Sequence, residues 1–177
     1  RSDEIGWLLG DHVLRHTSGD DRLVVTTLVS SSLLGKMAQK HGVAFAETFT
    51  GFKWIADAVV RRPNTRLVFA YEQALGYLVA DRPLDKDGIS AALVMTEIVA
   101  LAKRDGVTLQ DRLDEIATEY GQHVTAELSI KMSPSEGAAV VEQLRAHPPE
   151  MIGGRRVAGV EDFPEANLLR VWLDEVG

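Results

Sequence analysis

Residues 67–76 read Leu67-Val68-Phe69-Ala70-Tyr71-Glu72-Gln73-Ala74-Leu75-Gly76, an apolar run followed at once by a polar turn. A short run rich in β-branched and aromatic residues is typical of a buried strand, and a cluster ending in glycine is typical of a turn. Two more apolar runs, at residues 23–29 and 43–49, are followed by Ser30-Ser31-Ser32 and Thr50-Gly51-Phe52-Lys53. The sequence therefore predicts buried strands that end in polar clusters.

Helical patterns separate these runs, because apolar residues recur there at the spacing of one helix face. The motif Thr108-x-x-Asp111 resembles a capping box at the start of the last of these helices. The predicted helices lie at residues 5–16, 33–41, 54–59, 88–104 and 109–120. Strands that alternate with helices in this way predict an α/β fold, with a three-layer mixed, mostly parallel sheet and helices on both faces.

Ligands of such sheets bind outside the carboxyl ends of the strands. The three polar clusters, and a fourth at Asp85-Lys86-Asp87-Gly88, are therefore expected along one edge of the sheet. Each cluster lies where a strand ends and a helix begins, so it can offer free backbone N–H groups and the positive end of a helix dipole. This arrangement favours an anionic ligand.

The pattern changes near Gly121. Residues 122–131 alternate polar and apolar side chains, as a strand with one solvated face does, and Ser133-Pro134-Ser135-Glu136 has the form of a capping box. Two further strands are predicted at about residues 155–160 and 168–173. We predict two domains, at residues 1–121 and 122–177, the second a partial α+β domain, since the chain ends where another strand would be expected.

Composition excludes several classes of protein. The net charge of −7 argues against nucleic acid as a partner, and the absence of cysteine removes disulfides and thiolate chemistry. No apolar stretch is long enough to span a membrane and no signal peptide is recognised, so we expect a cytoplasmic protein. His12 and His16 have the i, i+4 spacing of a metal site but no third ligand, and no metal site is predicted.

Three of the clusters occur in a characteristic order. Thr50-Gly51-Phe52-Lys53, then Glu72-Gln73-Ala74-Leu75-Gly76, then Asp85-Lys86-Asp87-Gly88 together resemble the α-D-phosphohexomutase superfamily, the phosphoglucomutases and phosphomannomutases. The resemblance covers roughly residues 3–130. It is to the third of the family's four domains, and residues 122–177 look like the beginning of the fourth.

The resemblance implies an isomerase that transfers a phosphoryl group between the 1- and 6-positions of a hexose phosphate. The family's phosphoserine, its Asp-rich Mg²⁺ loop and its Arg-Pro-Ser-Gly-Thr phosphate loop lie in other domains, and none of these motifs occurs here. The chain then supplies sugar recognition, binds no Mg²⁺ itself and is inactive alone. Its partners are the hexose phosphate, the N-terminal domains and the rest of the C-terminal domain of the same enzyme.

The resemblance also assigns roles to residues. Glu72 would accept hydrogen bonds from adjacent sugar hydroxyls, where a charged acceptor forms the stronger bond. Lys86 would face the transferring phosphate, either stabilising its charge, which we favour, or moving a proton. The predicted substrate-binding residues are Thr50, Gly51, Phe52, Lys53, Glu72, Gln73, Ala74 and Gly76, with Lys86 as the catalytic residue. Gln73 and Ala74 stand where the family usually has a second acid or a serine, a departure that bears on sugar preference.

Other interpretations of these residues remain open at this stage. Glu72 is alternatively a solvated acid at a strand end, and Lys53 is alternatively a surface lysine. A non-catalytic α/β module that keeps the fold for interaction or regulation is the alternative function, favoured by Gln73 and by the missing loops. Glu72 and Lys86 argue for the enzyme.

Overall fold

The computed structural model describes residues 1–81 and 83–174 of the chain. These residues divide into two units, Arg1–Ala126 and Glu127–Gly177. Each unit is described by itself.

The first unit alternates helices with the strands of one sheet. Its elements are α1 (Ser2–His16), β1 (Arg22–Thr27), α2 (Leu33–Lys40), β2 (Ala44–Thr48), α3 (Phe52–Val60), β3 (Arg66–Glu72), β4 (Gly76–Leu78), α4 (Gly88–Asp105) and α5 (Leu109–Tyr120). The sheet has the order β2-β1-β3-β4, in which β1 is parallel to β2 and β3, and β4 is antiparallel to β3. The predicted mixed, mostly parallel sheet is confirmed, although β4 was not predicted.

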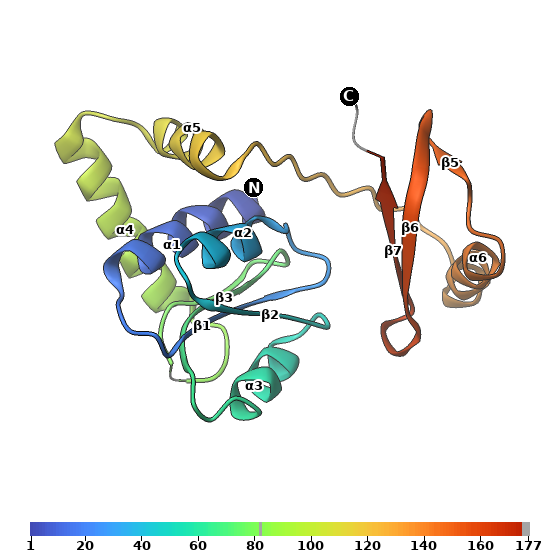
Figure 1. Cartoon of the computed structure of the whole chain (residues 1–177), viewed down its shortest axis with the longest axis horizontal. Coiled ribbons are helices and arrows are strands. Elements are labelled where there is room, and N and C mark those ends of the chain that lie inside the picture. Colours follow the sequence, from blue (N-terminus) through green and yellow to red (C-terminus); the bar gives the residue numbers. More distant parts are fainter. Residues whose placement is uncertain (82, 175–177) are drawn as a thin grey trace. The chain divides into compact units, whose positions relative to one another are not determined.

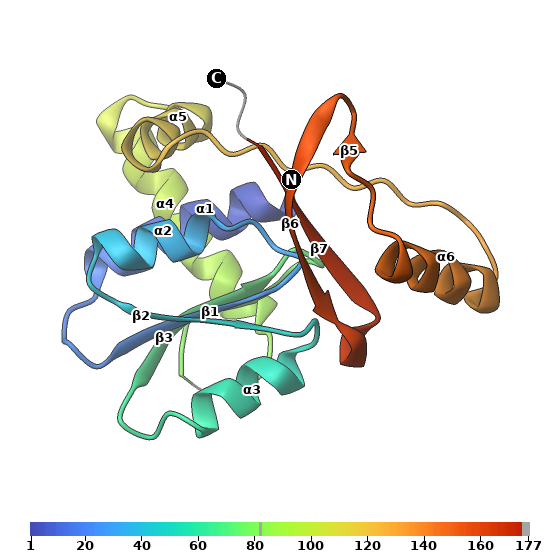
Figure 2. The ribbon, with the colours of Figure 1, turned by 45° about the vertical axis from the view of Figure 1, so that its right-hand side comes forward.

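Helices cover both faces of this sheet (Figure 1 and Figure 2). On one face, apolar side chains of α1, α2, α4 and α5 pack against Val24, Phe69 and Tyr71 of the strands. On the other face, α3 packs Phe52 and Ile55 against a smaller cluster of strand residues. Strands β1 and β3 are buried on both sides, which explains their continuous apolar runs, whereas in the edge strand β2 only Ala46 is buried.

The helix ends follow the local sequence. Thr108 and Asp111 form the predicted capping box of α5, and Asp87 caps α4 by accepting hydrogen bonds from the backbone of Ile89 and Ser90. Gly106 ends α4 with a φ of 73°, a left-handed conformation that glycine adopts without a steric penalty. At α2 the Ser31 side chain, rather than the N-cap Ser32, accepts a hydrogen bond from Leu33 N–H at 3.2 Å.

A buried carboxylate fixes the start of α1 to the sheet. Asp3 is 6% exposed, and its Oδ1 accepts hydrogen bonds from the Tyr71 hydroxyl at 2.9 Å and from Ser31 N–H at 3.1 Å. Burial, followed by the charge of Asp3, raises the pKa of Tyr71, so this hydroxyl remains a donor. The contact ties α1, the β1–α2 loop and β3 together.

The second unit is a helix followed by an antiparallel sheet. It contains α6 (Pro134–Ala146), β5 (Met151–Ile152), β6 (Arg155–Phe163), the 3-10 turn η1 (Pro164–Ala166) and β7 (Leu168–Leu173), with strand order β5-β6-β7. Ser133 and Glu136 form the predicted capping box, with Pro134 in the first turn. None of residues 127–174 is buried, so this part of the chain has no closed core of its own.

One predicted strand is wrong. Residues 122–131 have no regular secondary structure, and Val124, Leu128 and Ile130 are 76%, 87% and 69% exposed. Alternation of polar and apolar residues indicates a half-buried strand only where a neighbouring strand can complete the backbone hydrogen bonds. No strand in the described part of the chain pairs with this segment.

Tyr71→Phe tests the contact between α1 and the sheet. Because it removes one of the two donors to the buried Asp3 carboxylate, we expect the free energy of unfolding to fall by about 1–3 kcal/mol. Urea denaturation of the 177-residue chain measures this change. Tyr77→Phe is the control. The partly buried Tyr77 hydroxyl donates to the carbonyl oxygen of Ser2 at 2.8 Å, so its removal deprives a neutral acceptor, and not a buried carboxylate, of a hydrogen bond. Equal stabilities of Tyr71→Phe and the unchanged chain would contradict this role.

Candidate functional site

Parallel pairing brings three strand ends to one edge of the sheet. Ser30 follows β1, Thr50 and Gly51 follow β2, and Glu72 is the last residue of β3. Two hydrogen bonds join these segments: Gly51 N–H donates to Glu72 Oε1 at 2.5 Å, and Gln73 N–H donates to Ser30 Oγ at 3.0 Å. The predicted alignment is therefore present for these three clusters, and it is held by hydrogen bonds between them.

Glu72 is the buried charged group of this edge. It is 7% exposed, and its Oε1 binds the backbone N–H of Gly51, the residue that caps α3. The positive end of the α3 dipole and the free amide both stabilise a carboxylate there. Gly51 has a φ of 119°, which a residue with a Cβ rarely adopts, so glycine lets this amide turn toward Glu72. Glu72 is thus a part of the fold as well as a candidate ligand group.

Gly76 allows the site to close. A Cβ at this position would lie 2.6 Å from Phe52 Cε2 and 3.0 Å from Glu72 Oε2, so only glycine permits both neighbours to pack against the start of β4. The Phe52 ring is 5% exposed and belongs to the core beneath α3. The whole residue is buried, backbone included, so Phe52 packs against the site from the core side.

Lys86 lies beside this group, although it comes from the segment between β4 and α4. Its ammonium is 5.8 Å from the centre of the Phe52 ring and 3.1 Å from Asp85 Oδ1, and its side chain is 59% exposed. The hydrogen bond from Lys86 lowers the pKa of the Asp85 carboxyl. Hydrogen bonds from Ser90 and from Ile89 N–H lower the pKa of Asp87, in keeping with its role as the α4 cap.

The other predicted site residues border this group. Thr50, Lys53 and Ala74 are exposed, and Gln73 is half-buried. The structure thus brings together Gly51, Phe52, Glu72, Gly76 and Lys86 by direct contacts, and places Thr50, Lys53, Gln73 and Ala74 next to them in the chain. Their roles in binding stay predictions.

Sequence reasoning missed two features of this edge. Trp54 is 39% exposed, packs edge-on against Phe49 with ring centres 5.5 Å apart, and has the Lys53 ammonium 5.2 Å from its ring centre. Leu75 is 69% exposed with a φ of 64°, a left-handed conformation uncommon for leucine. A tryptophan is most simply explained by packing, which gives no signal of an exposed ring, and nothing in the sequence around Leu75 signals its backbone conformation.

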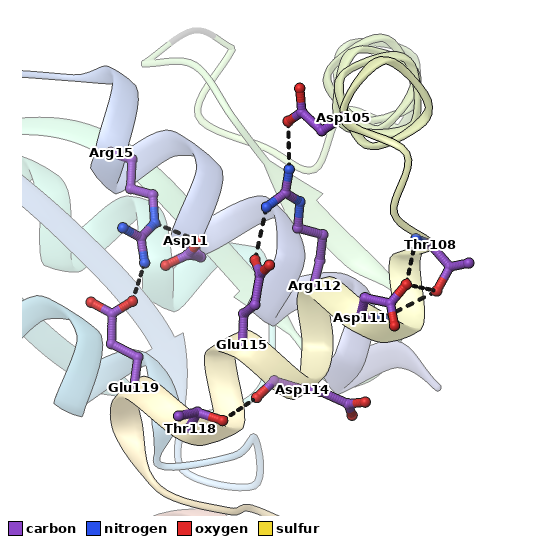
Figure 3. Close-up of polar contacts among 10 residues, drawn as sticks. All are labelled: Asp11, Arg15, Asp105, Thr108, Asp111, Arg112, Asp114, Glu115, Thr118 and Glu119. Atoms are coloured by element: carbon purple, nitrogen blue, oxygen red, sulfur yellow. Dashed lines mark hydrogen bonds and ion pairs between the residues drawn. The ribbon is translucent and has the colours of Figure 1, made fainter.

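A hollow lies away from this edge, between α1, α4 and α5. It has a volume of about 580 Å³, an apolar floor that includes Leu8 and Ile116, and a charged rim. Figure 3 shows two of its three arginines: Arg15 pairs with Asp11 and Glu119, and Arg112 pairs with Asp105 and Glu115. The third, Arg104, pairs with Asp105. These charges are satisfied within the protein and join the helices, so the strand-end edge is the better candidate site.

Within the described ranges, 1–81 and 83–174, no three His, Asp or Glu side chains are grouped so that they could hold a metal ion. The helices of the same ranges include none with the length and apolar character needed to cross a membrane.

Comparison with known proteins gives the family. The family model for the α/β/α domain III of phosphoglucomutase/phosphomannomutase matches residues 1–120. The chain belongs to the phosphoglucomutase/phosphomannomutase family. The resemblance carried by the three motifs is thereby confirmed.

Relatives agree with this assignment. The chain is 39% identical over 156 residues to a protein named "probable phosphomannomutase" from Haemophilus influenzae, and the match covers 87% of this chain and 31% of the relative. It is 34% identical over 196 residues to the phosphoglucomutase of Staphylococcus haemolyticus, covering 97% of this chain and 36% of that enzyme. The chain thus spans about a third of the length of these curated relatives.

Solved structures share the fold. A crystal structure of a protein from Thermus thermophilus matches with a TM-score of 0.70 at 17% identity, covering 98% of this chain and 33% of that one. The open form of parafusin, a phosphoglucomutase from Paramecium, matches with a TM-score of 0.65 at 18% identity, covering 98% of this chain and 32% of that one.

Gly76→Ala tests the close packing of the site. The added Cβ would overlap the Phe52 ring and crowd Glu72, so we expect the free energy of unfolding to fall by about 1–3 kcal/mol. Gly88→Ala is a matched control, because a Cβ there meets no atom within 4 Å. Urea denaturation of both variants measures the difference. If Gly76→Ala unfolds at the same urea concentration as Gly88→Ala, then Gly76 is not constrained as described.

Proposed function

We propose that this chain is the sugar-recognition part of a phosphohexomutase, an isomerase that moves a phosphoryl group between the 1- and 6-positions of a hexose phosphate. The observation that carries the proposal is the buried Glu72 carboxylate, set between the Gly51 amide and Gly76, with the Lys86 ammonium beside the same Phe52 ring. These residues belong to the motifs that the family shares.

Glu72 suits a substrate that must bind in two orientations. A carboxylate has about four lone-pair sites, and the Gly51 amide uses one of them, so acceptor capacity remains for sugar hydroxyls. A sugar turned end for end still presents hydroxyls from the middle of its ring, and a short-range charged acceptor can hold them in both orientations. Thr50 and Gly51 border this acceptor, with Gln73 and Ala74 on the other loop.

Lys86 suits the developing charge on the transferring phosphoryl group. Its ammonium is exposed and lies 3.1 Å from Asp85 Oδ1. A lysine that acts as a base near neutral pH needs to lose much of its solvation, whereas the side chain of Lys86 is 59% exposed. We therefore favour charge stabilisation over proton transfer for Lys86, with Lys53 as a second cation for phosphate at the same edge.

The rest of the machinery must come from elsewhere in the enzyme. Phosphoryl transfer needs a donor, a metal and groups that neutralise the phosphate, arranged around the reacting atoms. We propose that the N-terminal domains and the remainder of the C-terminal domain of a cytoplasmic, Mg²⁺-dependent enzyme supply them. In this proposal residues 1–121 form the sugar-binding domain and residues 122–177 begin the C-terminal domain. The comparisons with known proteins give no support to the alternative of a non-catalytic module.

The first kinetic test is Glu72→Ala in the full-length enzyme, assayed with glucose 1-phosphate, mannose 1-phosphate and a catalytic bisphosphate. Loss of charged hydrogen bonds at about 1.5–3 kcal/mol each predicts a fall in kcat/KM of about 10²-fold or more. Glu72→Gln separates the two roles of the side chain, since it keeps an acceptor for Gly51 N–H but removes the charge. Wild-type kinetics for a folded Glu72→Ala would remove Glu72 from the site, and an inactive wild-type enzyme would contradict the proposed function.

The second kinetic test is Lys86→Met. Because the proposed interaction is strongest in the transition state, we expect kcat to fall by about 10²-fold or more, with KM nearly unchanged. Lys36→Met, at an exposed position of α2, is the control for loss of a positive charge. An increase in KM alone, with kcat retained, would show that Lys86 contributes only to binding. A bell-shaped pH profile that loses one limb in Lys86→Met would instead favour proton transfer.

A further inference from the structure

Leu75 ends the turn that joins β3 to β4. Its φ is 64°, in the left-handed region where a bulky side chain crowds the backbone. The other non-glycine residue with a positive φ in the described ranges is Asn167, and asparagine adopts this conformation several times more readily than most residues. Glycine or asparagine at position 75 would therefore form the same turn with less strain.

The fold gains little from the Leu75 side chain. The residue is 69% exposed, and it belongs to neither of the two core clusters found among the described residues of the first unit. Strained residues are concentrated at sites of binding and catalysis, where the strain is offset by the contact that the residue makes. A contact with a ligand accounts for leucine at this position, whereas packing within the chain does not.

The turn holds Leu75 beside the candidate acceptor for sugar hydroxyls. Glu72 and Gly76 are paired across the hairpin, and a Cβ on Gly76 would lie 3.0 Å from Glu72 Oε2. Leu75 comes immediately before Gly76 in the chain, so it borders this carboxylate oxygen. At the other end of the turn, Gln73 N–H donates to Ser30 Oγ at 3.0 Å. Both ends of the turn are thus fixed to the strand-end edge.

A hexose ring presents two kinds of surface to such an edge. Its hydroxyls form hydrogen bonds, for which the Glu72 carboxylate is suited, and its carbon-bound hydrogens form apolar patches. A leucine side chain has no polar atom, so it can cover a C–H patch and remove it from water. It disfavours an epimer that directs a hydroxyl toward it, because that hydroxyl would lose water without gaining a hydrogen bond.

We propose that Leu75 is a specificity-determining residue, which packs on the C–H surface of the hexose ring held by Glu72 and discriminates between hexose epimers. This inference rests on the proposed function, because it takes the hexose phosphate as the ligand of the strand-end edge. It adds to that function a contact that selects the sugar through its apolar surface.

The test compares Leu75→Asn with Leu75→Met. Asparagine has nearly the size of leucine and tolerates a positive φ, but it is polar; methionine keeps an apolar side chain of similar length. A structural role of the turn is served by asparagine, whereas a contact with C–H groups is served by methionine. Val60→Asn, at the last residue of α3, is the matched control, since Val60 is 67% exposed and Leu75 is 69% exposed.

The first measurement is the urea concentration at the midpoint of unfolding of the 177-residue chain. Because asparagine relieves the strain at position 75, we expect the midpoint of Leu75→Asn to equal or exceed that of the unchanged chain. A lower midpoint for Leu75→Asn would show that the leucine stabilises the fold, and would overturn the inference.

The second measurement is steady-state kinetics of the full-length enzyme with glucose 1-phosphate and mannose 1-phosphate. For Leu75→Asn we expect kcat/KM with the preferred sugar to fall about fivefold or more, mainly through KM, because the ring contact is the same in the ground and transition states. The ratio of kcat/KM between the two epimers should narrow about threefold or more, as one lost apolar contact allows. Leu75→Met and Val60→Asn should stay within about twofold of the unsubstituted enzyme for both sugars.

An unchanged ratio between the two epimers in a folded Leu75→Asn enzyme would overturn the inference, because a general defect in packing lowers both rates alike. If the unsubstituted enzyme converts neither sugar phosphate, the proposed function itself is wrong. If that enzyme is active and Leu75→Asn has the same kinetics, only the role of Leu75 is wrong.

Discussion

The hydrogen bond from Gly51 N–H to Glu72 organises the strand-end edge. A carboxylate that is 7% exposed is costly unless a donor meets it, and the free amide at the start of α3 is the donor that the fold supplies. This requirement fixes the β2–α3 turn against the end of β3. Gly76 and the Phe52 ring can then approach to contact distance, and Lys86 comes to lie beside that ring.

Two aromatic rings at the start of α3 each have a lysine ammonium over them, although the chain as a whole is acidic. The net charge is −7, yet Lys86 lies over the Phe52 ring and Lys53 lies over the Trp54 ring. Residues two apart on a helix point in nearly opposite directions, so Phe52 faces the core and Trp54 faces outward. Attraction of an anionic ligand can be local in this way, whatever the overall charge.

The sequence predicted what depends on local chemistry. The apolar runs predicted β1, β2 and β3, and the capping boxes at Thr108 and Ser133 predicted the starts of two helices. It could not predict β4, because a three-residue strand is too short to show a period. Nor could it predict that Glu72 accepts from Gly51, since the partners are 21 residues apart and meet only through parallel pairing.

The wrong strand at residues 122–131 and the exposed face of α4 have one physical cause. A pattern of apolar residues predicts which side chains are buried, but it does not identify the elements that pack against them. For β1 and β3 the cover is α1, α2 and α3, so pattern and structure agree. Val124, Leu128 and Leu93 are exposed among the described residues. The segment that contains Val124 and Leu128 forms no strand, whereas Leu93 lies in the helix α4. A helix forms its backbone hydrogen bonds within itself, whereas a strand needs a neighbouring strand. Helix α4 therefore forms although one of its faces is apolar and exposed, and residues 122–131 do not form a strand.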